Sequence, residues 1–486
     1  MSAIVKLSKI VAIAMVGIVL VIYLTLAFLS RKLPDLRAEH RIEFEHEFDA
    51  SMEDETDWAA YLARENMLAQ ELAEVMANDQ RPASRVDRYS PDSLTYPGNF
   101  GDNWNRSYEM TSPAPRGVAV LLHGLTDSPY SMLSTSEALV AAGYNVVVPR
   151  MPGHGFAVGG MLQARWEDWG AAVRIAIRRA MQRAGADQSL LIVGYSNGGL
   201  MAIDYALRCG DYEDLACPHG LVLISPAIAV SPLAVVANIH SAISWMPYFE
   251  KFRWQSVLPE IDPFKFTSFA NRAAWEINGL LRRTHQDLEQ PDRVANLPPI
   301  LTFQSAVDNT VSAQAIVNLL YKRLPPSGSK LVVYSVNSDN TLLQLMRGEP
   351  VNPAAYFQST APMFFDVTVL QNRNAHSKAL DTFSLNSGET EAIVEETNYA
   401  WPDEVFSLSH IALPFRPDDQ VYGDGRYNNA DTVAFGALAP RGERGVMQLN
   451  PDYFLRIRYN PFFAFQQRTL IEWIDQIPAT EPAPED

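Results

Sequence analysis

The stretch Leu190–Leu207, LLIVGYSNGGLMAIDYAL, places a serine between two glycines where a strand pattern gives way to a helix pattern. The apolar run Leu190–Val193 is typical of a short buried strand. After the serine, apolar residues recur at the spacing of one helix face, at Leu200, Met201, Ile203 and Leu207. Ser196 is therefore predicted at the tip of a sharp strand-to-helix turn.

From Asn103 onward the chain alternates short apolar runs with helical patterns. Strands are predicted over 117–124, 144–155, 189–196, 220–230 and 298–308, and helices over 131–143 and 166–185. This alternation predicts an α/β fold with a mostly parallel sheet whose two faces are covered by helices. Open sheets of this kind bind their ligands at the carboxyl ends of the strands, so catalytic residues are expected there.

Ser196 has the surroundings that nucleophilic catalysis needs. A free serine hydroxyl is a weak nucleophile, so an enzyme must expose it, hold a base nearby and offer N–H donors to the oxyanion that forms. Gly194 and Gly198 have no Cβ, which lets the strand and the helix approach closely enough to hold Ser196 in a strained elbow. The G-x-S-x-G pattern also arises by chance around structural serines, but its strand–turn–helix context favours a nucleophile.

The segment 120–132, VLLHGLTDSPYSM, predicts the oxyanion hole. A strand there ends at His123, where the loop that supplies one donor belongs. We expect two backbone N–H donors, from Leu125 and from Asn197, the residue after the nucleophile. His123 and His154 are interpreted as residues that shape their loops by hydrogen bonding rather than as bases.

Five motifs that follow one another along roughly residues 103–322 resemble the α/β-hydrolase family of esterases and lipases. Within that family they are close to the monoacylglycerol-lipase, carboxylesterase and serine-aminopeptidase-like branch. The motifs are HGLTDSP (123–129), PRMPGHG (149–155), WEDWG (166–170), GYSNGG (194–199) and ILTFQSAVDNTVS (300–312). The resemblance implies a Ser-Asp-His triad, a cap over the substrate pocket, and no cofactor.

The triad of this fold follows the chain order serine, acid, histidine, so the acid should come just after the strand 298–308. Asp308 fits this position. Its carboxylate would accept the imidazole N–H, fix the tautomer and stabilise the imidazolium that forms when Ser196 loses its proton. A plain turn aspartate is the alternative interpretation.

The position of the triad histidine departs from the simple family pattern, because no histidine occurs between Asp308 and His376. Two histidines remain downstream. His410 follows a short apolar strand in VFSLSHIALPF and precedes a predicted final helix over 462–477. His376 lies in the turn-rich stretch NRNAHSKAL. We favour His410 as the base, and we expect the intervening insertion to leave the sheet and re-enter it before His410.

Two segments interrupt the alternation and divide the chain. The first is rich in aromatic residues and is predicted to be a helical cap, and the second carries polar turns and β-rich pieces. The predicted segments are a transmembrane anchor (10–29), an acidic helical membrane-proximal segment (31–95), a hydrolase core in three parts (96–230, 298–335, 405–477), the cap (231–297), the insertion (336–404) and a disordered tail (478–486).

The membrane prediction rests on Ile10–Leu29, an uncharged apolar run whose 20 residues match the ~20 that cross a bilayer core as a helix. A cleaved signal peptide is the alternative, although its apolar region is usually only ~7–15 residues long. A helix that begins at Trp58 behind a Thr56 cap is predicted after the anchor. Basic residues after the run favour a cytoplasmic location for the rest of the chain: Arg31, Lys32, Arg37 and Arg41.

Cys209 and Cys217 are the only cysteines, and they flank a short loop. A disulfide between them would indicate an oxidising compartment, and two unrelated thiols are an equal alternative. The sequence therefore leaves both sides of the membrane open as the location of the catalytic domain. No metal site is assigned, because the cluster His40, Glu43, His46 and Glu47 has no known ligand spacing and is typical of a solvated acidic helix.

The charge composition limits the classes of molecule that the protein could bind. Lysine and arginine total 39 against 56 aspartates and glutamates, so the formal net charge is −17 and nucleic acid is excluded. The best interpretation is a membrane-anchored serine hydrolase that cleaves carboxylic esters of a small-molecule or lipid-like substrate through an acyl-enzyme. The cap aromatics favour an apolar acyl or aryl group, unless they form the cap's own core.

Two alternatives stay open. One is a serine aminopeptidase, which would need a cap carboxylate to hold the substrate ammonium, and Glu250, Glu260 and Asp262 are available for this. The other is a non-catalytic binding protein that keeps the hydrolase fold, which an intact nucleophile, acid and histidine disfavour.

Overall fold

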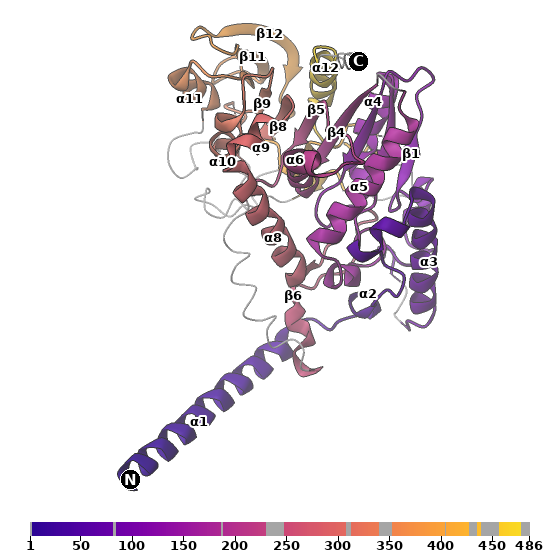
Figure 1. Cartoon of the computed structure of the whole chain (residues 1–486), viewed down its shortest axis with the longest axis vertical. Coiled ribbons are helices and arrows are strands. Elements are labelled where there is room, and N and C mark those ends of the chain that lie inside the picture. The colour runs from indigo at the N-terminus through magenta and orange to yellow at the C-terminus, as the bar shows by residue number, and fades with distance from the viewer. Residues whose placement is uncertain are drawn as a thin grey trace.

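The computed structural model describes residues 2–80, 84–185, 188–229, 247–307, 313–339, 352–403, 405–426, 435–438 and 456–477. The predicted tail, 478–486, and the start of the predicted cap lie outside these ranges. In the described part, a central sheet carries helices on both faces, and one long helix projects away from the body (Figure 1).

Over the described residues, the central sheet has ten strands in the order β1-β3-β2-β4-β5-β8-β9-β10-β11-β12. Their bounds are β1 Tyr108–Met110, β2 Gly117–Leu122, β3 Tyr144–Val148, β4 Ser189–Tyr195, β5 Gly220–Ile224, β8 Ile300–Ser305, β9 Lys330–Tyr334, β10 Asp366–Asn372, β11 Ala379–Leu385 and β12 Ile393–Ala400. Neighbours from β3 to β10 run parallel, whereas β1, β11 and β12 pair antiparallel. The predicted parallel sheet is confirmed.

The helices cover both faces of the sheet because its parallel strands are apolar on both faces. Along β2, Val118 and Val120 pack into one core, and Ala119 and Leu121 into the other. The helices are α1 Ser2–Lys32, α2 Ala38–Arg41, α3 Trp58–Ala77, α4 Leu133–Ala141, α5 Trp166–Arg183, α6 Asn197–Arg208, α8 Asn271–Leu288, α9 Pro291–Ala295, α10 Ala313–Leu319, α11 Pro353–Thr360 and α12 Phe463–Ile474. Helices α5, α6 and α8 pack on one side, and α4 and α12 on the other.

The segment 336–404 extends the central sheet. Strand β10 pairs parallel with β9, and β11 and β12 follow as an antiparallel pair at the edge. The expectation that this insertion leaves the sheet and re-enters it is therefore wrong. The physical reason is that β10 satisfies its backbone hydrogen bonds on the free edge of β9, and β11 and β12 then add to β10 in turn. Two small two-stranded sheets are also found in the described residues. In one, β6 (Trp254–Ser256) pairs with β7 (Phe269–Ala270), and in the other, β13 (Ala437–Leu438) pairs with β14 (Arg456–Ile457).

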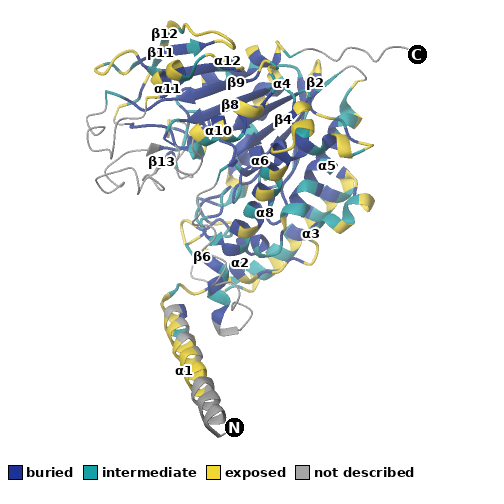
Figure 2. Cartoon of the chain, turned by 60° about the vertical axis from the view of Figure 1, so that its left-hand side comes forward, coloured by how far each residue is buried: buried dark blue, intermediate teal, exposed yellow. Residues whose placement is uncertain are grey.

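Helix α1 is long and apolar enough to cross a membrane over Ile13–Lys32, and its described side chains are mostly exposed (Figure 2). By length and composition alone a signal sequence would pass the same test. Helix α3 begins at Trp58 as predicted, but its cap is Asp57, whose carboxylate accepts from Ala60 N at 2.8 Å. Thr56 instead donates its hydroxyl to Met52 O at 2.7 Å, in the preceding turn.

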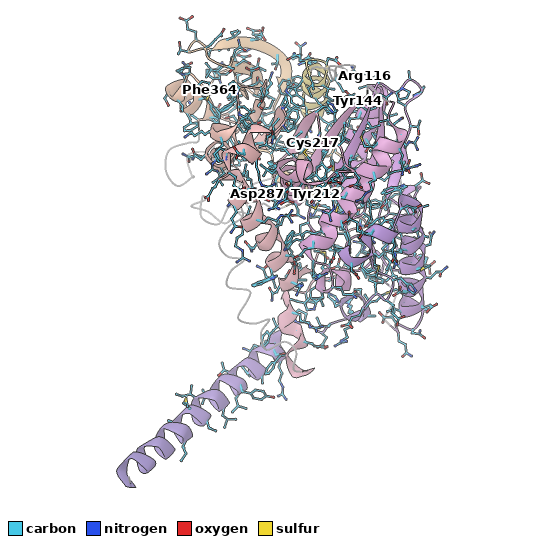
Figure 3. The ribbon with its side chains drawn as sticks, viewed as in Figure 1. Arg116, Tyr144, Tyr212, Cys217, Asp287 and Phe364 are labelled. Atoms are coloured by element: carbon cyan, nitrogen blue, oxygen red, sulfur yellow. A yellow bond between two sulfur atoms is a disulfide. The ribbon has the colours of Figure 1, made fainter. Side chains whose placement is uncertain are left out.

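Cys209 and Cys217 are bonded to each other, with their Cα atoms 5.1 Å apart, in the loop between α6 and β5 (Figure 3). Of the two alternatives for these cysteines, the structure contains the disulfide. Disulfides persist mainly in oxidising compartments.

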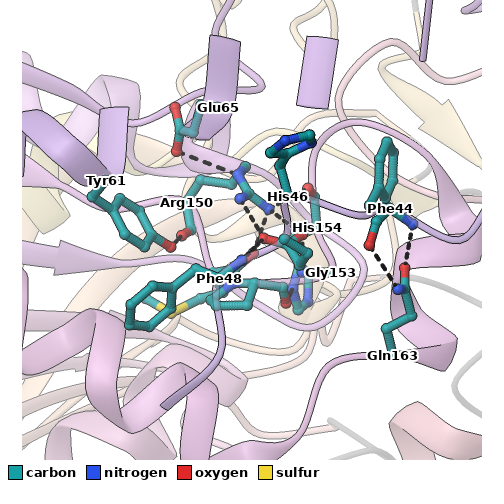
Figure 4. A network of polar contacts seen from close by, with 12 residues as sticks. Phe44, His46, Phe48, Tyr61, Glu65, Arg150, Gly153, His154 and Gln163 are labelled. Atoms are coloured by element: carbon teal, nitrogen blue, oxygen red, sulfur yellow. Dashed lines mark hydrogen bonds and ion pairs between the residues drawn. The ribbon is translucent and has the colours of Figure 1, made fainter. Parts of the chain in front are cut away.

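A buried ion network joins the membrane-proximal segment to the core (Figure 4). The Arg150 guanidinium, in the loop after β3, lies 2.8 Å from Glu47 and 3.3 Å from Glu65, and all three side chains are buried. Tyr61 of α3 donates to the carbonyl of Arg150 at 2.6 Å. Burial raises the pKa of the Glu65 carboxyl, and the neighbouring Arg150 opposes this rise. Glu47, Tyr61 and Glu65 thus bind this segment to the loop after β3.

Replacing Arg150 tests this packing. Arg150→Met leaves two buried carboxylates without their cation, so we expect a loss of about 3–5 kcal/mol in the free energy of unfolding. Arg468→Met is the matched control, because Arg468 lies 3.8 Å from Glu472 and both side chains are more than half exposed. The control should cost at most about 1 kcal/mol. Chemical denaturation of the detergent-solubilised protein measures both, and equal losses would contradict the assignment.

Candidate active site

Ser196 stands at the elbow between β4 and α6 in a strained conformation, with φ of +53° and ψ of −114°. A left-handed backbone is rare for a residue with a side chain, and it clusters at functional sites. The backbone is held on both sides, because Ser196 N donates to Ile224 O and Ala227 N donates to Ser196 O, each at 2.9 Å. The Ser196 side chain is partly exposed although its neighbours are buried.

The two flanking glycines are required by close backbone contacts. A Cβ on Gly194 would lie 2.3 Å from the carbonyl oxygen of Gly198. A Cβ on Gly198 would lie 2.0 Å from the carbonyl oxygen of Leu122 and 2.8 Å from that of His123. The start of α6 is thus pressed against the end of β2. The sequence predicts the close approach of Gly194 to Gly198 between β4 and α6, and the structure adds the contact of Gly198 with β2.

His123 fixes the loop after β2. Its Nε2 accepts from Met151 N at 3.0 Å, so the ring proton is on Nδ1, which donates to Gly124 O at 2.9 Å. Burial lowers the pKa of His123, and the ring is neutral. His154 lies beside it, with Nδ1 3.0 Å from Pro152 O, and burial lowers its pKa to about 4. Both histidines shape loops.

The predicted oxyanion donors lie on the two elements that meet at this contact. Leu125 follows the loop's glycine, and the next residue, Thr126, has a φ of +65°. Asn197 is the first residue of α6. The first N–H groups of a helix have no partner within the helix and are available to an anion.

His410 returns to the carboxyl edge of the sheet, although it is far from Ser196 in sequence. Ser305 at the end of β8 donates its hydroxyl to Leu408 O at 2.7 Å. Asn337, just beyond β9, donates its backbone N–H to Phe406 O at 2.8 Å and its side-chain amide to Val405 O at 2.9 Å. These bonds hold the segment before His410 over the ends of the strands that follow β5 in the sheet.

His376 lies in the turn between β10 and β11 and is exposed. These strands lie beyond β9 in the sheet order, on the side away from β4. Asp308 lies outside the described residues, and β8, which precedes it, ends at Ser305 on the edge where Ser196 lies. The described structure therefore places the elbow, the loop after β2 and the segment before His410 at the same edge of the sheet.

A turn of the cap contacts the loop after β2, and the sequence did not predict this. Lys265 Nζ lies 2.8 Å from Asp127 Oδ2, and Phe266 N donates to Thr126 O at 2.8 Å. Burial raises the pKa of Asp127, and Lys265 opposes this rise. Two features of the sequence could have indicated this contact. They are an aspartate two residues after a predicted oxyanion donor and a single lysine in the aromatic run PFKF.

The three cap carboxylates that an aminopeptidase could use already have partners. Glu250 pairs with Arg41 at 2.6 Å, and Glu260 accepts from Thr267 N and Ser268 N at 3.0 and 2.8 Å. Asp262 pairs with Arg458 Nη1 at 2.8 Å and accepts from the Tyr422 hydroxyl at 2.5 Å. Several cap aromatics are also buried inside the protein, which makes them part of its core: Phe249, Phe252, Trp254, Phe264 and Phe266.

The cluster His40, Glu43, His46 and Glu47 is not the solvated acidic helix that the sequence predicts, because α2 ends at Arg41 and His40 is buried. Its members bind separate partners. His40 Nε2 lies 3.1 Å from Ser268 Oγ, His46 lies 2.7 Å from Glu71, and Glu47 pairs with Arg150. Among the described residues, no group of three or more histidine, cysteine, aspartate or glutamate side chains could hold a metal ion.

Known proteins match the central part of the chain. Residues 113–336 match the family model of serine aminopeptidase, S33. The thermostable monoacylglycerol lipase of Bacillus sp. (strain H-257) is 25% identical over 224 residues, which are 46% of this chain and 78% of that protein.

Solved structures match a similar share of the chain. One belongs to the metagenome-derived lipolytic enzymes LipS and LipT, with 23% identity and a TM-score of 0.37, covering 47% of this chain and 87% of that one. Another is the monoacylglycerol lipase of Paleococcus ferrophilus, with 21% identity and a TM-score of 0.36, at the same two coverages.

The glycine contact at the elbow is testable. Gly198→Ala forces a Cβ against a backbone carbonyl, which cannot move as a side chain can, so we expect at least about 1–3 kcal/mol of destabilisation. Gly210→Ala is the matched control, because a Cβ there meets nothing within 4 Å. It should change the free energy of unfolding by less than about 0.5 kcal/mol. Urea titration of both variants measures the difference, and a Gly198→Ala protein as stable as the control would refute the contact.

Proposed function

We propose that this protein hydrolyses carboxylic esters with a serine nucleophile. Residues 113–336 belong to the α/β hydrolases of the monoacylglycerol-lipase-like branch, which supports this proposal. The observation that carries the proposal is the conformation of Ser196, strained and partly exposed on a strand-to-helix elbow. Strain of this kind persists only where the surrounding structure enforces it, which supports a catalytic role over a mere binding fold.

In the proposed mechanism, Ser196 Oγ attacks the ester carbonyl carbon while His410 takes the hydroxyl proton. The backbone N–H groups of Leu125 and Asn197 stabilise the oxyanion. His410 then donates the proton to the leaving alkoxide, which departs as the alcohol and leaves an acyl group on Ser196. Water, deprotonated by His410, releases the acid, and Asp308 orients the imidazole throughout. No cofactor takes part.

An ester substrate is favoured over an amino-terminal peptide. An aminopeptidase holds the substrate ammonium with an acidic group, and Glu250, Glu260 and Asp262 are each bound to groups of the protein itself. Using one of them would require breaking an ion pair or leaving buried N–H groups without acceptors. The described cap therefore supports a neutral substrate.

A lipid-like substrate taken from a bilayer is supported by the contact between α1 and the cap. The rings of Tyr23 in α1 and Phe249 in the cap lie 5.2 Å apart, edge to face. Lys251 of the cap donates to Leu33 O at 2.9 Å and pairs with Asp35 at 2.7 Å. We propose that α1 is an uncleaved anchor and that it keeps the cap at the membrane surface. The disulfide supports an oxidising compartment for the catalytic domain.

The triad is tested by three alanine variants. We expect Ser196→Ala and His410→Ala each to lower kcat for a p-nitrophenyl ester by at least about 10³-fold, and the double variant to be hardly worse, because triad members act as one unit. His376→Ala, at the exposed turn, is the matched control and should retain full activity. Thermal unfolding checks that each variant is folded. Full turnover in Ser196→Ala, or loss in His376→Ala alone, would contradict the assignment.

The anchor is tested by removing residues 1–31. We expect the shortened protein to hydrolyse a water-soluble short-chain ester as before, because the elbow and the loop after β2 lie outside the deleted segment. Hydrolysis of monoacylglycerol in phospholipid vesicles should fall about tenfold or more, because attachment raises the effective concentration of enzyme at the bilayer. Equal vesicle rates would contradict the proposal. A mature chain that starts beyond Ser30, by mass measurement, would identify a cleaved signal.

A further inference from the structure

A turn of the cap, residues 262–266, is docked on the loop that carries the proposed oxyanion donor Leu125. Two bonds make the contact: Phe266 N donates to Thr126 O, and Lys265 Nζ lies 2.8 Å from Asp127 Oδ2. Both loop residues lie directly after Leu125. Any movement of this turn is therefore transmitted to the backbone of the loop.

The Asp127 carboxylate lies over the backbone of the loop. A Cβ on Gly124 would meet Asp127 Oδ2 at 2.8 Å, and Asp127 is buried. The carboxylate therefore lies beside Gly124, the residue before Leu125, whose N–H would face the negative charge of the oxyanion. A second negative charge at that position in a medium of low dielectric constant opposes the oxyanion.

The turn that brings Lys265 to this carboxylate is itself rigidly held. Asp262 Oδ1 accepts from Phe264 N and Lys265 N, each at 3.1 Å, which closes the turn. Asp262 also binds Tyr422 and Arg458. Tyr422 belongs to the described segment 405–426, which also carries His410. The turn therefore joins the loop after β2 to the segment of the proposed base.

We propose that Lys265 is a positioning residue for the ester hydrolysis proposed above. Its ammonium neutralises the Asp127 carboxylate, which would otherwise repel the oxyanion, and holds the loop in place. This inference rests on the proposed function of Ser196. Lys265 does not touch the substrate in this account, and its effect reaches the reaction through Asp127 and the backbone of Leu125.

The sign of the pH dependence follows from the groups that face Asp127. These are Lys265 of the cap, Asp262 of the same turn, and His410. Burial and Asp262 raise the pKa of Asp127, and Lys265 and His410 lower it. Removing the charge of Lys265 therefore raises this pKa further. As the pH falls through the raised value, Asp127 becomes neutral and ceases to oppose the oxyanion.

The experiment uses the full-length protein in detergent and a water-soluble p-nitrophenyl ester between pH 5 and 9. Lys265→Gln keeps a donor for the carboxylate but removes the positive charge. We expect kcat to fall about tenfold or more at pH 8, with KM changed less than about threefold, because the loss acts on the transition state. The ratio of variant to wild-type kcat should rise as the pH falls.

Two further variants distinguish the effect of the Lys265 charge on kcat from the effect of the shape of its side chain. Asp127→Asn together with Lys265→Gln removes both charges and should restore most of kcat at pH 8, because no carboxylate opposes the oxyanion. Lys265→Arg keeps the cation and should also recover activity. A structural role for Lys265 alone would give a loss that is independent of pH and not relieved by Asp127→Asn.

The inference is overturned if Lys265→Gln has wild-type kcat at every pH, or if the double variant is no better than the single one. Where Lys265→Gln does not fold, the double variant decides alone: kcat within about threefold of wild type supports the inference, and a larger loss overturns it. Ser196→Ala is measured beside them. Full activity there refutes the proposed function, whereas an inactive Ser196→Ala with an unaffected Lys265→Gln refutes only the inference.

Discussion

The close approach of the Gly198 backbone to the carbonyl oxygens of Leu122 and His123 is the constraint on which the candidate site depends. The start of α6 can press against the end of β2 because Gly198 has no Cβ to meet these backbone oxygens. Ser196 is then left with a positive φ and a partly exposed side chain. The first turn of α6 and the loop after β2 consequently lie side by side, as an oxyanion hole requires.

The remaining parts of the molecule are attached to this centre through buried charges. Arg150 binds the membrane-proximal segment to the loop after β3 through Glu47 and Glu65. Asp262 and Lys265 bind the cap to the loop after β2 and to the segment of His410. Buried ion pairs add little net stability, but breaking one is costly, so they hold parts of the molecule in one arrangement. The same centre is thus connected to α1, because α1 contacts the cap.

The sequence predicted those features that depend on local pattern. The buried strands β2 to β5 and the elbow at Ser196 follow from apolar runs and two glycines, and the structure contains them. Strand β11 was not predicted, because the sequence ALDTFSL carries no strong alternation and is paired only through its neighbours. The helical spacing of α3 predicts its start but not its cap: threonine and aspartate are both preferred N-cap residues, and in the structure Asp57, not Thr56, caps the helix.

Contacts between residues that lie far apart in the chain could not be predicted from the sequence. Lys265 and Asp127 lie far apart in the chain, and no spacing rule relates a cap lysine to a loop aspartate. The return of His410 to the edge of the sheet depends on bonds from Ser305 and Asn337 that only the folded chain reveals. The chain order of the proposed triad is expected from the resemblance, whereas the path of the chain around the three added strands is not.

The central claim is that Ser196 is an activated nucleophile. The most direct measurement is to react the full-length protein with a fluorophosphonate, which labels only activated serines, and to map the modified peptide by mass spectrometry. The account predicts stoichiometric labelling of Ser196 and no labelling of protein unfolded beforehand in urea. A folded protein that stays unlabelled, or one labelled at a different serine, would contradict it.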